Sequence, residues 1–581
     1  MFFVSDIIKH MLKVVVKKEI EDSAKAELSL YPELTQHLLY HRGINTKEKA
    51  ENFLNPVYED NSDPFLMKDM NKAVHRILDA IEHEEKIVIF SDYDADGIPG
   101  AVILHDFFKK INYHNFANYI PHRVLDGFGL NEDSINEFFD IGAKLIITVD
   151  CGITDVKEIE KANYFGMDVI ITDHHLPKEE VPKAFAILDP KLEELKDTGS
   201  NLCGAGVAFK LVQGLIKESS GLFKIQEGWE KWLLDMVGIA TISDMVSLTG
   251  ENRIFASYGL KVLRKTPRPG IMQLLNLLKI NQHYLTEDDI SFMITPRINA
   301  ASRMGEPEDA FLLLSTKDDG EATAMAIHLN NINDERKGLV ASMVKEIKKK
   351  IASHTDNGKK KVLVVGNPDW KPSLLGLVAT ALLEEHKGPV FLWGRENGTC
   401  LKGSCRSDGK VDIFELMKEA SDMFDEYGGH AMSGGFSISL DKVDTIAGVL
   451  EKAYEKLASK IIEDGETVVD LRLSLDEVNE KTYFQIDKMS PFGVDNPKPL
   501  FLFEKIEVEE VKIFGKTKNH LELVFKNTKG QKISAIGFFC LPDTWGREIK
   551  RGDKIDLVAS MEKSYFKSKA ELRLRVVDIT C

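Results

Sequence analysis

The chain has 581 residues and a formal net charge of -17, with 43% hydrophobic and 29% charged residues, and its length suggests about three or four domains rather than one core. No apolar run reaches the roughly 18 residues of a membrane-spanning helix, and the first twenty residues mix acids and lysines without a small-residue cleavage site, so we expect a cytoplasmic protein with no membrane partner. The negative charge argues against general polyanion binding, so local basic patches or metal ions must hold any nucleic acid.

The first half of the chain changes character near residue 76. Residues 1–75 alternate short helical patterns with loops and carry no assignable motif. From 86 to about 250, short apolar runs alternate with helical stretches, which predicts a parallel α/β sheet. The expected strands are KIVIF (86–90), KLIITV (144–149), MDVIIT (167–172), FAILDP (185–190) and MVGIATIS (236–243).

The second half contains three further patterns. Residues 266–355 are mainly helical and end in a long charged helix over 332–353, whose lysine run, like the one at 359–361, indicates a solvated helix end and linker. Residues 356–462 form a second α/β unit, and residues 463–581 alternate short strands with turns, which predicts a small antiparallel barrel. The second α/β unit has expected strands at 361–366, 388–393 and 434–440 and a helix at 374–386.

Acids and histidines follow four of the expected strands of the first unit. Ligand sites of open α/β sheets lie outside the carboxyl ends of the strands, so these side chains should meet. Such a density of negative charge is tolerated when cations neutralise it, and mixed carboxylate and imidazole ligands suit Mn²⁺ or Mg²⁺. The pattern predicts a two-metal phosphoester hydrolase. The side chains are Asp92, Asp94 and Asp96, then Asp150, then Asp173, His174 and His175, then Asp244.

Each of these motifs also has an ordinary interpretation. DYDADG (92–97) resembles the start of a calcium-binding loop, but the glutamate of loop position twelve is absent and a buried strand precedes it. A lone His-His pair is more often a surface pair, and Asp150 could cap the next helix. The recurrence at four predicted strand ends favours the metal site. No disulfide framework or structural zinc is indicated, because no CxxC pair occurs among the cysteines at 151, 203, 400, 405, 540 and 581.

DYDADG, TVDCGIT (148–154) and TDHH (172–175), in this order, resemble the DHH phosphoesterase superfamily. Other segments are similar to its RecJ single-strand exonuclease branch, to the DHH-associated domain and to the entry of the RecJ-type OB fold. For the RecJ branch they are IPHRVLDGFGLN (120–131), LCGAGVAFKL (202–211), GIATISDMVSLTGENR (238–253) and TPRINAASRMGEP (295–307); for the DHH-associated domain, GSCRS (403–407) and YGGHAMSGGF (427–436); for the OB entry, SPFGVDNPKPLF (490–501).

The resemblance covers about residues 75–581 and implies a fold. Two α/β domains, DHH and DHH-associated, flank a metal-lined cleft, a long helix joins them, and a C-terminal OB-fold β-barrel follows. The expected bounds are 1–75 for an N-terminal region, 76–265 for the DHH domain, 266–355 for a helical connector, 356–462 for the DHH-associated domain and 463–581 for the OB fold.

The resemblance also implies roles for the acids and histidines. Two ions, Mn²⁺ or Mg²⁺, are assigned to Asp94, Asp96, Asp150, His174 and Asp244, with Asp150 as the bridge. Asp92 matches the metal motif but is a candidate to orient a ligand or a bound water. His175 is expected to contact a phosphate of the substrate.

Further residues match the substrate-contacting motifs of the family. Arg123, Arg297 and Arg303 are expected in loops that contact phosphate, although each arginine taken singly could have a structural ion pair. Asn299 is expected to order its loop. Other phosphate contacts are assigned to Ser404, Arg406 and Ser407, for which an ordinary strand-turn is the alternative, and to a phosphate-gripping turn at Gly428, Gly429 and His430.

Two observations concern the rest of the substrate path. The barrel segment 561–576 alternates basic and aromatic residues, which suits a base-stacking groove, with a solvated edge hairpin as the alternative. Lys371 and Ser373 stand where RecJ proteins commonly have histidine and glycine, and Cys405 stands where alanine is usual.

The resemblance implies an exonuclease that degrades single-stranded DNA processively from the 5′ end to nucleoside 5′-monophosphates in recombination and repair. A DHH phosphodiesterase acting on short oligonucleotides or RNA, and a replication-associated RecJ-like scaffold, are the alternatives. The barrel favours a long polymer, and the complete set of acids speaks against a scaffold. Single-strand-binding protein or a helicase is a candidate partner, and a monomer is favoured.

Overall fold

The computed structural model describes residues 14–192, 201–353, 360–395, 401–457, 466–515, 518–565 and 570–580. Residues 1–13, Lys359, Cys400 and Cys581 therefore lie outside the described residues. In the described part of the chain, no helix combines the length and the apolar character needed to cross a membrane.

The first domain is built on a five-stranded parallel sheet with the order β3-β2-β4-β5-β6. Because all neighbours are parallel, their carboxyl ends share one edge of the sheet. Helices α4, α5 and α8 pack on one face and α6 and α7 on the other. The strands are β2 (Lys86–Ser91), β3 (Phe116–Tyr119), β4 (Ala143–Val149), β5 (Asp168–Thr172) and β6 (Ala186–Leu188); the helices are α4 (Met70–Glu82), α5 (Gly97–Lys110), α6 (Glu132–Asp140), α7 (Val156–Tyr164) and α8 (Gly204–Glu218).

The prediction of a strand at 236–243 was wrong, because these residues belong to helix α9 (Leu234–Ser243). Residues 234–242 of this helix are all buried and mostly apolar, with no polar face, so the sequence has the same pattern as a buried strand. Gly238 lets α9 approach α10 (Gly250–Leu263) closely, since a Cβ built on it would lie 2.7 Å from the Cα of Gly259. Asp244 therefore follows a helix rather than a strand.

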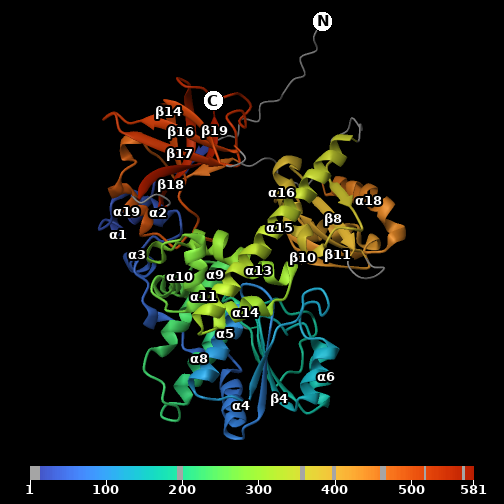
Figure 1. Cartoon of the computed structure of the whole chain (residues 1–581). Coiled ribbons are helices and arrows are strands. Elements are labelled where there is room, and N and C mark those ends of the chain that lie inside the picture. The colour runs from blue at the N-terminus through green and yellow to red at the C-terminus, as the bar shows by residue number, and fades with distance from the viewer. Residues whose placement is uncertain are drawn as a thin grey trace.

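The helical connector packs largely on the first domain. Side chains from Leu248 to Leu329 share the hydrophobic core of α4, α5 and α8. The long helix predicted at 332–353 is confirmed but begins earlier, as α15 (Asp319–Ser353), and it runs from the first domain to the second (Figure 1). The other connector helices are α11 (Pro269–Leu278), α12 (Glu287–Asp289), α13 (Thr295–Met304) and α14 (Glu308–Ser315).

The second domain has a mixed five-stranded sheet with the order β10-β11-β9-β8-β7. Only β7 and β8 are parallel, and the three expected strands and the expected helix all appear with slightly shifted ends. The elements are β7 (Leu363–Gly366), α16 (Pro372–His386), β8 (Val390–Arg395), β9 (Leu401–Arg406), α17 (Ile413–Glu419), β10 (Glu426–His430), β11 (Ser433–Ile438) and α18 (Val443–Lys456).

The C-terminal sheet has the order β13-β14-β18-β19-β17-β16-β15. Strands β14 and β15 are separated only by Val508 and Glu509, so the strand next to one end of this order continues almost directly into the strand at its other end, and the sheet curls into the expected barrel. The pairings of β13 with β14 and of β17 with β19 are parallel, and the others along the barrel are antiparallel. The strands are β13 (Leu471–Arg472), β14 (Phe501–Glu507), β15 (Glu510–Phe514), β16 (His520–Lys526), β17 (Lys532–Phe538), β18 (Lys554–Ser564) and β19 (Glu571–Thr580).

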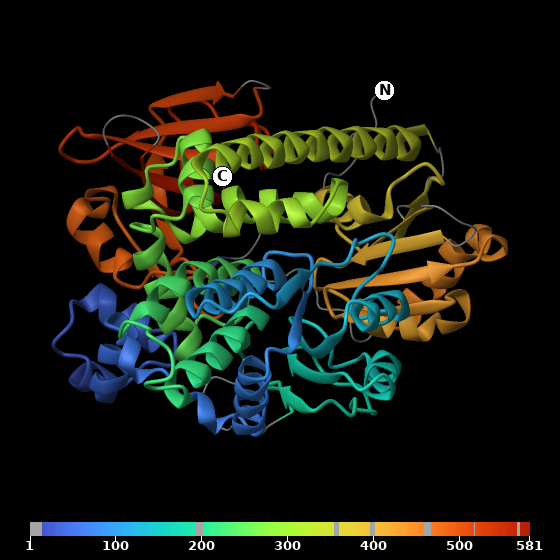
Figure 2. The ribbon, with the colours of Figure 1, turned by 60° about the horizontal axis from the view of Figure 1, so that its bottom comes forward.

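The N-terminal region packs against this barrel rather than standing alone. Leu28, Leu38 and Leu39 are fully buried in one core with barrel side chains such as Phe501 and Phe525. Figure 2 shows the blue N-terminal helices on the same side of the molecule as the orange and red C-terminal domain. The elements involved are α1 (Asp22–Glu27), α2 (Glu33–Tyr40), α3 (Lys47–Leu54) and α19 (Glu480–Asp487), and β1 (Val14–Val16) pairs in parallel with β12 (Thr467–Val469).

Candidate metal centre

The carboxyl edge of the first sheet gathers the predicted acids and histidines. Asp92, Asp94 and Asp96 lie between β2 and α5, Asp150 follows β4, and the two histidines follow β5. Asp244 reaches the same place from the C-terminal end of α9. Three overlapping groups have ligand atoms within 4.8 Å of one another: Asp150 with His174 and His175, Asp96 with His174 and Asp244, and Asp92 with Asp94 and Asp150.

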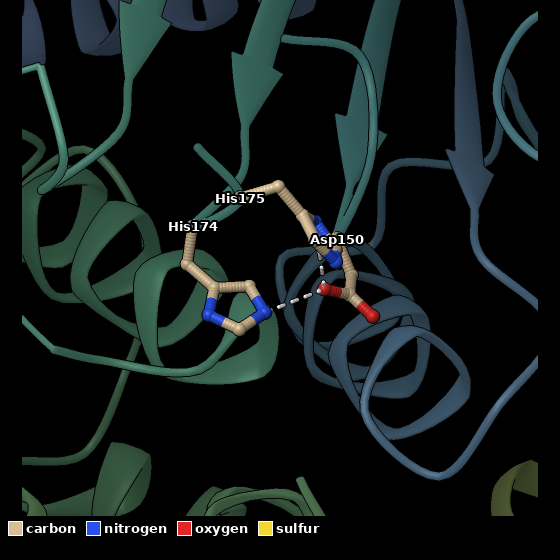
Figure 3. A group of neighbouring side chains, drawn as sticks. All are labelled: Asp150, His174 and His175. Atoms are coloured by element: carbon tan, nitrogen blue, oxygen red, sulfur yellow. Dashed lines mark ion pairs between the residues drawn. The ribbon is translucent and has the colours of Figure 1, made fainter. Parts of the chain in front are cut away.

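His174 and Asp150 lie at the centre of this cluster. The Nε2 atom of His174 is 3.1 Å from Asp150 Oδ1, 3.6 Å from Asp96 Oδ2 and 3.6 Å from Asp244 Oδ2. Figure 3 shows the Asp150 carboxylate between the rings of His174 and His175. Asp150 is 3% exposed and has a left-handed φ of 60°, a strained conformation that aims its carboxylate into the cluster.

The backbone around Asp94 and Asp96 is fixed by hydrogen bonds. The Asp94 carboxylate accepts the N–H groups of Asp96 and Gly97, at 2.8 and 3.2 Å, where α5 begins. The side-chain oxygen of Asn299 accepts the Ala95 N–H at 2.8 Å, so Asn299, which lies on α13 rather than in a loop, holds the segment between β2 and α5.

The start of α8 supports Asp96 from the other side. The N–H groups of Gly204 and Ala205 each donate to an Asp96 oxygen at 2.7 Å. These two hydrogen bonds, at the positive end of a helix, favour the ionised form of the Asp96 carboxyl group. Sequence reasoning did not assign Gly204 and Ala205 a role, although both lie in the LCGAG segment.

His175 is oriented by Asp173. Its Nδ1–H donates to Asp173 Oδ1 at 2.8 Å, and the other Asp173 oxygen accepts the Ile153 N–H at 3.0 Å. The side chain of His175 remains 43% exposed, and the ring of Phe128 packs edge-on against it at 5.6 Å between centroids. Asp173 was identified only as part of the TDHH motif; its role in orienting His175 emerges from the structure.

Burial and mutual repulsion dominate the electrostatics. Burial, followed by the neighbouring carboxylates, raises the pKa of Asp96 to about 7 and that of Asp244 to about 8, and raises the pKa values of Asp92 and Asp150 well above the usual range. Burial lowers the pKa of His174 to about 4. Burial alone would also lower the pKa of His175, but its hydrogen bond to Asp173 raises it to about 9.

The residues fit a divalent cation. Among the described residues, Asp92 Oδ1, Asp150 Oδ1 and His174 Nε2 are buried polar atoms that make no hydrogen bond, although the last two lie 3.1 Å apart as an ion pair. Buried polar atoms of this kind need a partner, and a cation that accepts oxygen and imidazole ligands supplies one. Asp150 belongs to two of the three groups, which suits the bridging position predicted for it.

The predicted phosphate contacts of the first domain and connector differ in their surroundings. Arg123 lies in a loop, with its guanidinium 4.9 Å from the centre of the Tyr93 ring. The prediction that Arg297 and Arg303 lie in loops was wrong, because both are on α13. Arg297 is 4% exposed and donates to Asn330 Oδ1 and the Met293 carbonyl, so in this structure it holds helices together.

Arg303 instead links the connector helix α13 to the second α/β domain. Its Nη1 donates to the Ser373 carbonyl at 2.8 Å, and the Ser373 hydroxyl donates to the Arg303 carbonyl at 3.0 Å. A glycine at position 373 would lack the second of these bonds. The departure from the family pattern thus adds a contact between α13 and α16.

In the second domain, Arg406 bonds within β9, to Ser404 Oγ at 3.3 Å and the Cys405 carbonyl at 2.7 Å. Ser407 is 2% exposed and donates to the Val411 carbonyl at 2.6 Å, which is a structural role. The GGH segment ends strand β10 instead of forming a turn, and Gly429 is required there because its φ is 147° and a Cβ would lie 2.3 Å from the Ser433 carbonyl oxygen.

The basic side chains of segment 561–576 are partly paired with acids. Lys563 contacts Glu480 at 2.8 Å, and Arg573 contacts Glu562 at 2.6 Å. The ring of Tyr565 stacks on the ring of Tyr284 in the connector, with 4.4 Å between the ring centroids and 8° between the ring planes. Residues 566–569 lie outside the described residues, so the stacking groove stays a prediction.

Comparisons with known proteins agree with this architecture. The family models described as "DHH family, N-terminal domain", "DHHA1 domain" and "RecJ OB domain" match residues 86–241, 358–456 and 469–578. They confirm the predicted fold class of two α/β domains, a long helix and an OB domain, while the finer domain bounds stay predictions.

Two curated relatives and one solved structure are similar over most of the chain. The single-stranded-DNA-specific exonuclease RecJ of Bacillus subtilis is 33% identical, over 97% of this chain and 70% of that protein. The protein of the same name from Haemophilus influenzae is 30% identical, over 91% of this chain and 92% of that protein. The crystal structure of RecJ from Thermus thermophilus in complex with Mn²⁺ has a TM-score of 0.79 and 25% identity, over 98% of this chain and 79% of that one. The chain therefore belongs to the RecJ family.

Proposed function

We propose that this protein is a divalent-metal-dependent exonuclease that degrades single-stranded DNA processively from its 5′ end to nucleoside 5′-monophosphates. The observation that carries the proposal is the buried cluster around Asp150 and His174, whose unpartnered atoms suit cations. An OB domain in the same chain suits a single strand, because such barrels offer a stacking surface with little sequence preference. The relatives carry the name of the same activity.

The proposed metal ligands are Asp94, Asp96, Asp150, His174 and Asp244, with Asp92 beside them. Two bound ions, Mn²⁺ or Mg²⁺, would activate a water molecule and offset the charge that develops on phosphorus. The chain itself fixes the ligands before any ion binds: the α8 N-terminus holds Asp96, and the turn at the start of α5 holds Asp94.

His175 and the arginines would place the phosphate. His175 is held by Asp173 yet remains exposed, so its ring is available to a phosphate oxygen of the substrate. Arg303 comes from the connector helix α13 and Arg406 from the second α/β domain, and both supply guanidinium groups, which pair well with phosphate oxygens.

The test is digestion of a 30-nucleotide DNA strand that carries a fluorophore on an internal base, in separate versions near each end, with Mn²⁺ or Mg²⁺. We expect mononucleotides as the first product, label release first from the version labelled near the 5′ end, and little hydrolysis of duplex DNA or of a dinucleotide. Early release from the 3′ end would contradict the proposed polarity. Faster hydrolysis of the dinucleotide would favour a small-molecule phosphodiesterase.

The same reaction on an RNA strand of identical sequence shows whether the protein hydrolyses DNA or RNA faster. We propose DNA as the preferred substrate, a monomer as the working form, the cytoplasm as its location and single-strand-binding protein or a helicase as a partner. Light scattering after size exclusion measures the oligomeric state directly, and a stable dimer would contradict that part of the proposal.

A further inference from the structure

Four arginines without acidic partners converge where α13 and α15 meet the two α/β domains. They come from the loop before α6, from α13, from α15 and from β9, and among the described residues none has a carboxylate within 4.0 Å. In a chain with a net charge of -17, cations without acidic partners at one place indicate an anionic ligand. The residues are Arg123, Arg303, Arg336 and Arg406.

Their proximity is visible in the electrostatics of Arg303. Burial, followed by the charges of Arg123, Arg336 and Arg406, lowers the pKa of Arg303 to about 10, and Asp94 of the metal cluster acts in the opposite direction. Arg303 therefore lies within electrostatic reach of both the other guanidinium groups and the metal site. Gly376 leaves the space for Arg406, because a Cβ there would lie 2.5 Å from its Nη2.

Arg336 is the member of this group that no family motif assigned. Its Nη2 donates to Asn333 Oδ1 at 2.9 Å, one turn back along α15. Its Nε is buried, and among the described residues it has no hydrogen-bond partner; the same holds for Nδ2 of Asn333, which is 0% exposed. Guanidinium groups present several fixed donors, so a charged donor left unused beside other arginines suits a phosphate acceptor.

The neighbouring residues of α15 show that this face of the helix is organised around α13. Asn330, Asn333 and Arg336 recur every third residue, and Asn330 Oδ1 accepts two bonds from Arg297 of α13, at 3.3 and 3.1 Å. The Asn330 amide thus holds Arg297 in place. The Asn333 amide orients Arg336, whose Nε–H is left without an acceptor among the described residues. The helix that joins the two domains thereby carries a cation to the place where they meet.

We propose that Arg336 binds a backbone phosphate of the single strand together with Arg123, Arg303 and Arg406, and so acts in substrate binding from the connecting helix. This inference rests on the proposed function, since it takes the anion to be a nucleic-acid strand. Arg336 is assigned to binding and positioning, not to the chemical step.

The experiment measures binding apart from hydrolysis. A 5′-phosphorylated, 3′-fluorescein-labelled (dT)₁₂ strand is titrated with the full chain in EDTA, where it stays intact, at several KCl concentrations. The slope of log K against log [KCl] counts the phosphate contacts, at about 0.7 for each contact with a single strand. Wild type is compared with Arg336→Ala, Arg336→Lys and the matched control Lys337→Ala, which removes a neighbouring, half-exposed lysine paired with Asp334.

We expect Arg336→Ala to weaken binding about 10- to 100-fold and to reduce the slope by about 0.7. Arg336→Lys should restore the slope, because it keeps the charge, and Lys337→Ala should leave both quantities unchanged. The inference would be overturned if Arg336→Ala had the same slope as wild type. It would also be overturned if Arg336→Ala and Lys337→Ala weakened binding equally. A thermal melt of each variant checks the fold, and Arg336→Gln, which keeps the aliphatic stem to Cδ and a neutral hydrogen-bond donor, replaces the alanine variant if that one fails to fold.

Failure of the proposed function gives a different result. If Mn²⁺-dependent digestion is absent but Arg336→Ala reduces the slope of log K against log [KCl], the strand binds as inferred and the proposed reaction is wrong. If digestion proceeds and the slope ignores Arg336, only the role of Arg336 is wrong.

Discussion

Gly204 lies directly against Asp150: a Cβ atom built on Gly204 would be 2.4 Å from the Cβ of Asp150 and 2.7 Å from its Oδ1. The start of α8 and the end of β4 therefore approach each other as closely as their backbones allow. Because the neighbouring N–H groups of α8 also hold Asp96, one helix end sets the position of two proposed metal ligands.

We expect Gly204→Ala to displace the Asp150 carboxylate and to reduce the metal-dependent rate by about 100-fold, which is the usual effect of a misplacement of about 1 Å. Overpacking should also cost about 1–3 kcal/mol of unfolding free energy. The measurements are kcat with Mn²⁺ and urea unfolding. Gly448→Ala is the control, because nothing lies within 4 Å of a Cβ there and alanine favours the α18 helix. Equal rates in the two variants would contradict the close approach.

Asp150→Ala should abolish hydrolysis, with a loss of more than about 100-fold, because the carboxylate belongs to two of the three ligand groups. Calorimetric titration with Mn²⁺ should show at least one fewer bound ion. Asp140→Ala, at the exposed end of α6, is the matched control. Undiminished activity in Asp150→Ala would rule out the two-metal arrangement.

Asp173→Asn should loosen His175 without removing any proposed ligand. Since the hydrogen bond to Asp173 raises the pKa of His175 to about 9, we expect this pKa to fall toward its ordinary value of 6.5 in the variant. The imidazole proton resonances of the metal-free protein report this change, and kcat should fall by about 10- to 100-fold. A His175 pKa that stays near 9 would show that another group controls it.

The metal-free protein should lose stability as the pH rises. The pKa values of Asp96 and Asp244 rise from 3.8 in the unfolded chain to about 7 and 8 in the fold, so between about pH 4 and pH 8 the folded state binds more protons. The unfolding free energy then falls with increasing pH. We expect the Tm in EDTA to drop between about pH 6 and 8, and saturating Mn²⁺ to remove most of this drop. A flat Tm in EDTA would mean that burial and the neighbouring carboxylates do not raise the pKa values of these acids as the structure indicates.

Arg253→Ala should destabilise the junction between catalytic and barrel domains. Its guanidinium donates to the carbonyls of Phe53 at 2.6 Å, Met489 at 3.1 Å and Ser490 at 3.0 Å, and its loss leaves buried acceptors unpaired. We expect a cost of about 3 kcal/mol or more in urea unfolding, against less than about 1 kcal/mol for Arg472→Ala, an exposed arginine paired with Glu504. Similar costs would show that Arg253 contributes no more to stability than a surface arginine.

The sequence predicted that these acids and histidines lie together because strand ends are a topological property. Asp94, Asp150 and His174 follow apolar runs that must be parallel strands, and parallel strands deliver their ends to one edge. Asp244 was placed at the cluster for an incorrect reason, since a helix buried on all sides has no polar face to distinguish it from a strand.

The other predictions were limited because they depend on packing between residues far apart in the sequence. Nothing in the local pattern shows that Arg297 is buried between helices while Arg303 reaches the second domain, because both lie on the same short helix and differ only in what faces them. The partner of the N-terminal helices was equally invisible, since an apolar stripe predicts burial without naming the surface that covers it. The roles of Asp173 and Gly204 depend on contacts that only the assembled sheet creates.

The shared core of the N-terminal helices and the barrel has a consequence for biosynthesis. Arg42 donates to Asn496, 454 positions further along the chain, and β1 finds its partner in β12. The N-terminal helices therefore leave the ribosome long before the segments that they pack against. Leu28, Leu38 and Leu39 stay uncovered throughout translation, so a nascent chain stalled before the barrel presents these leucines to chaperones even when its catalytic domain is complete.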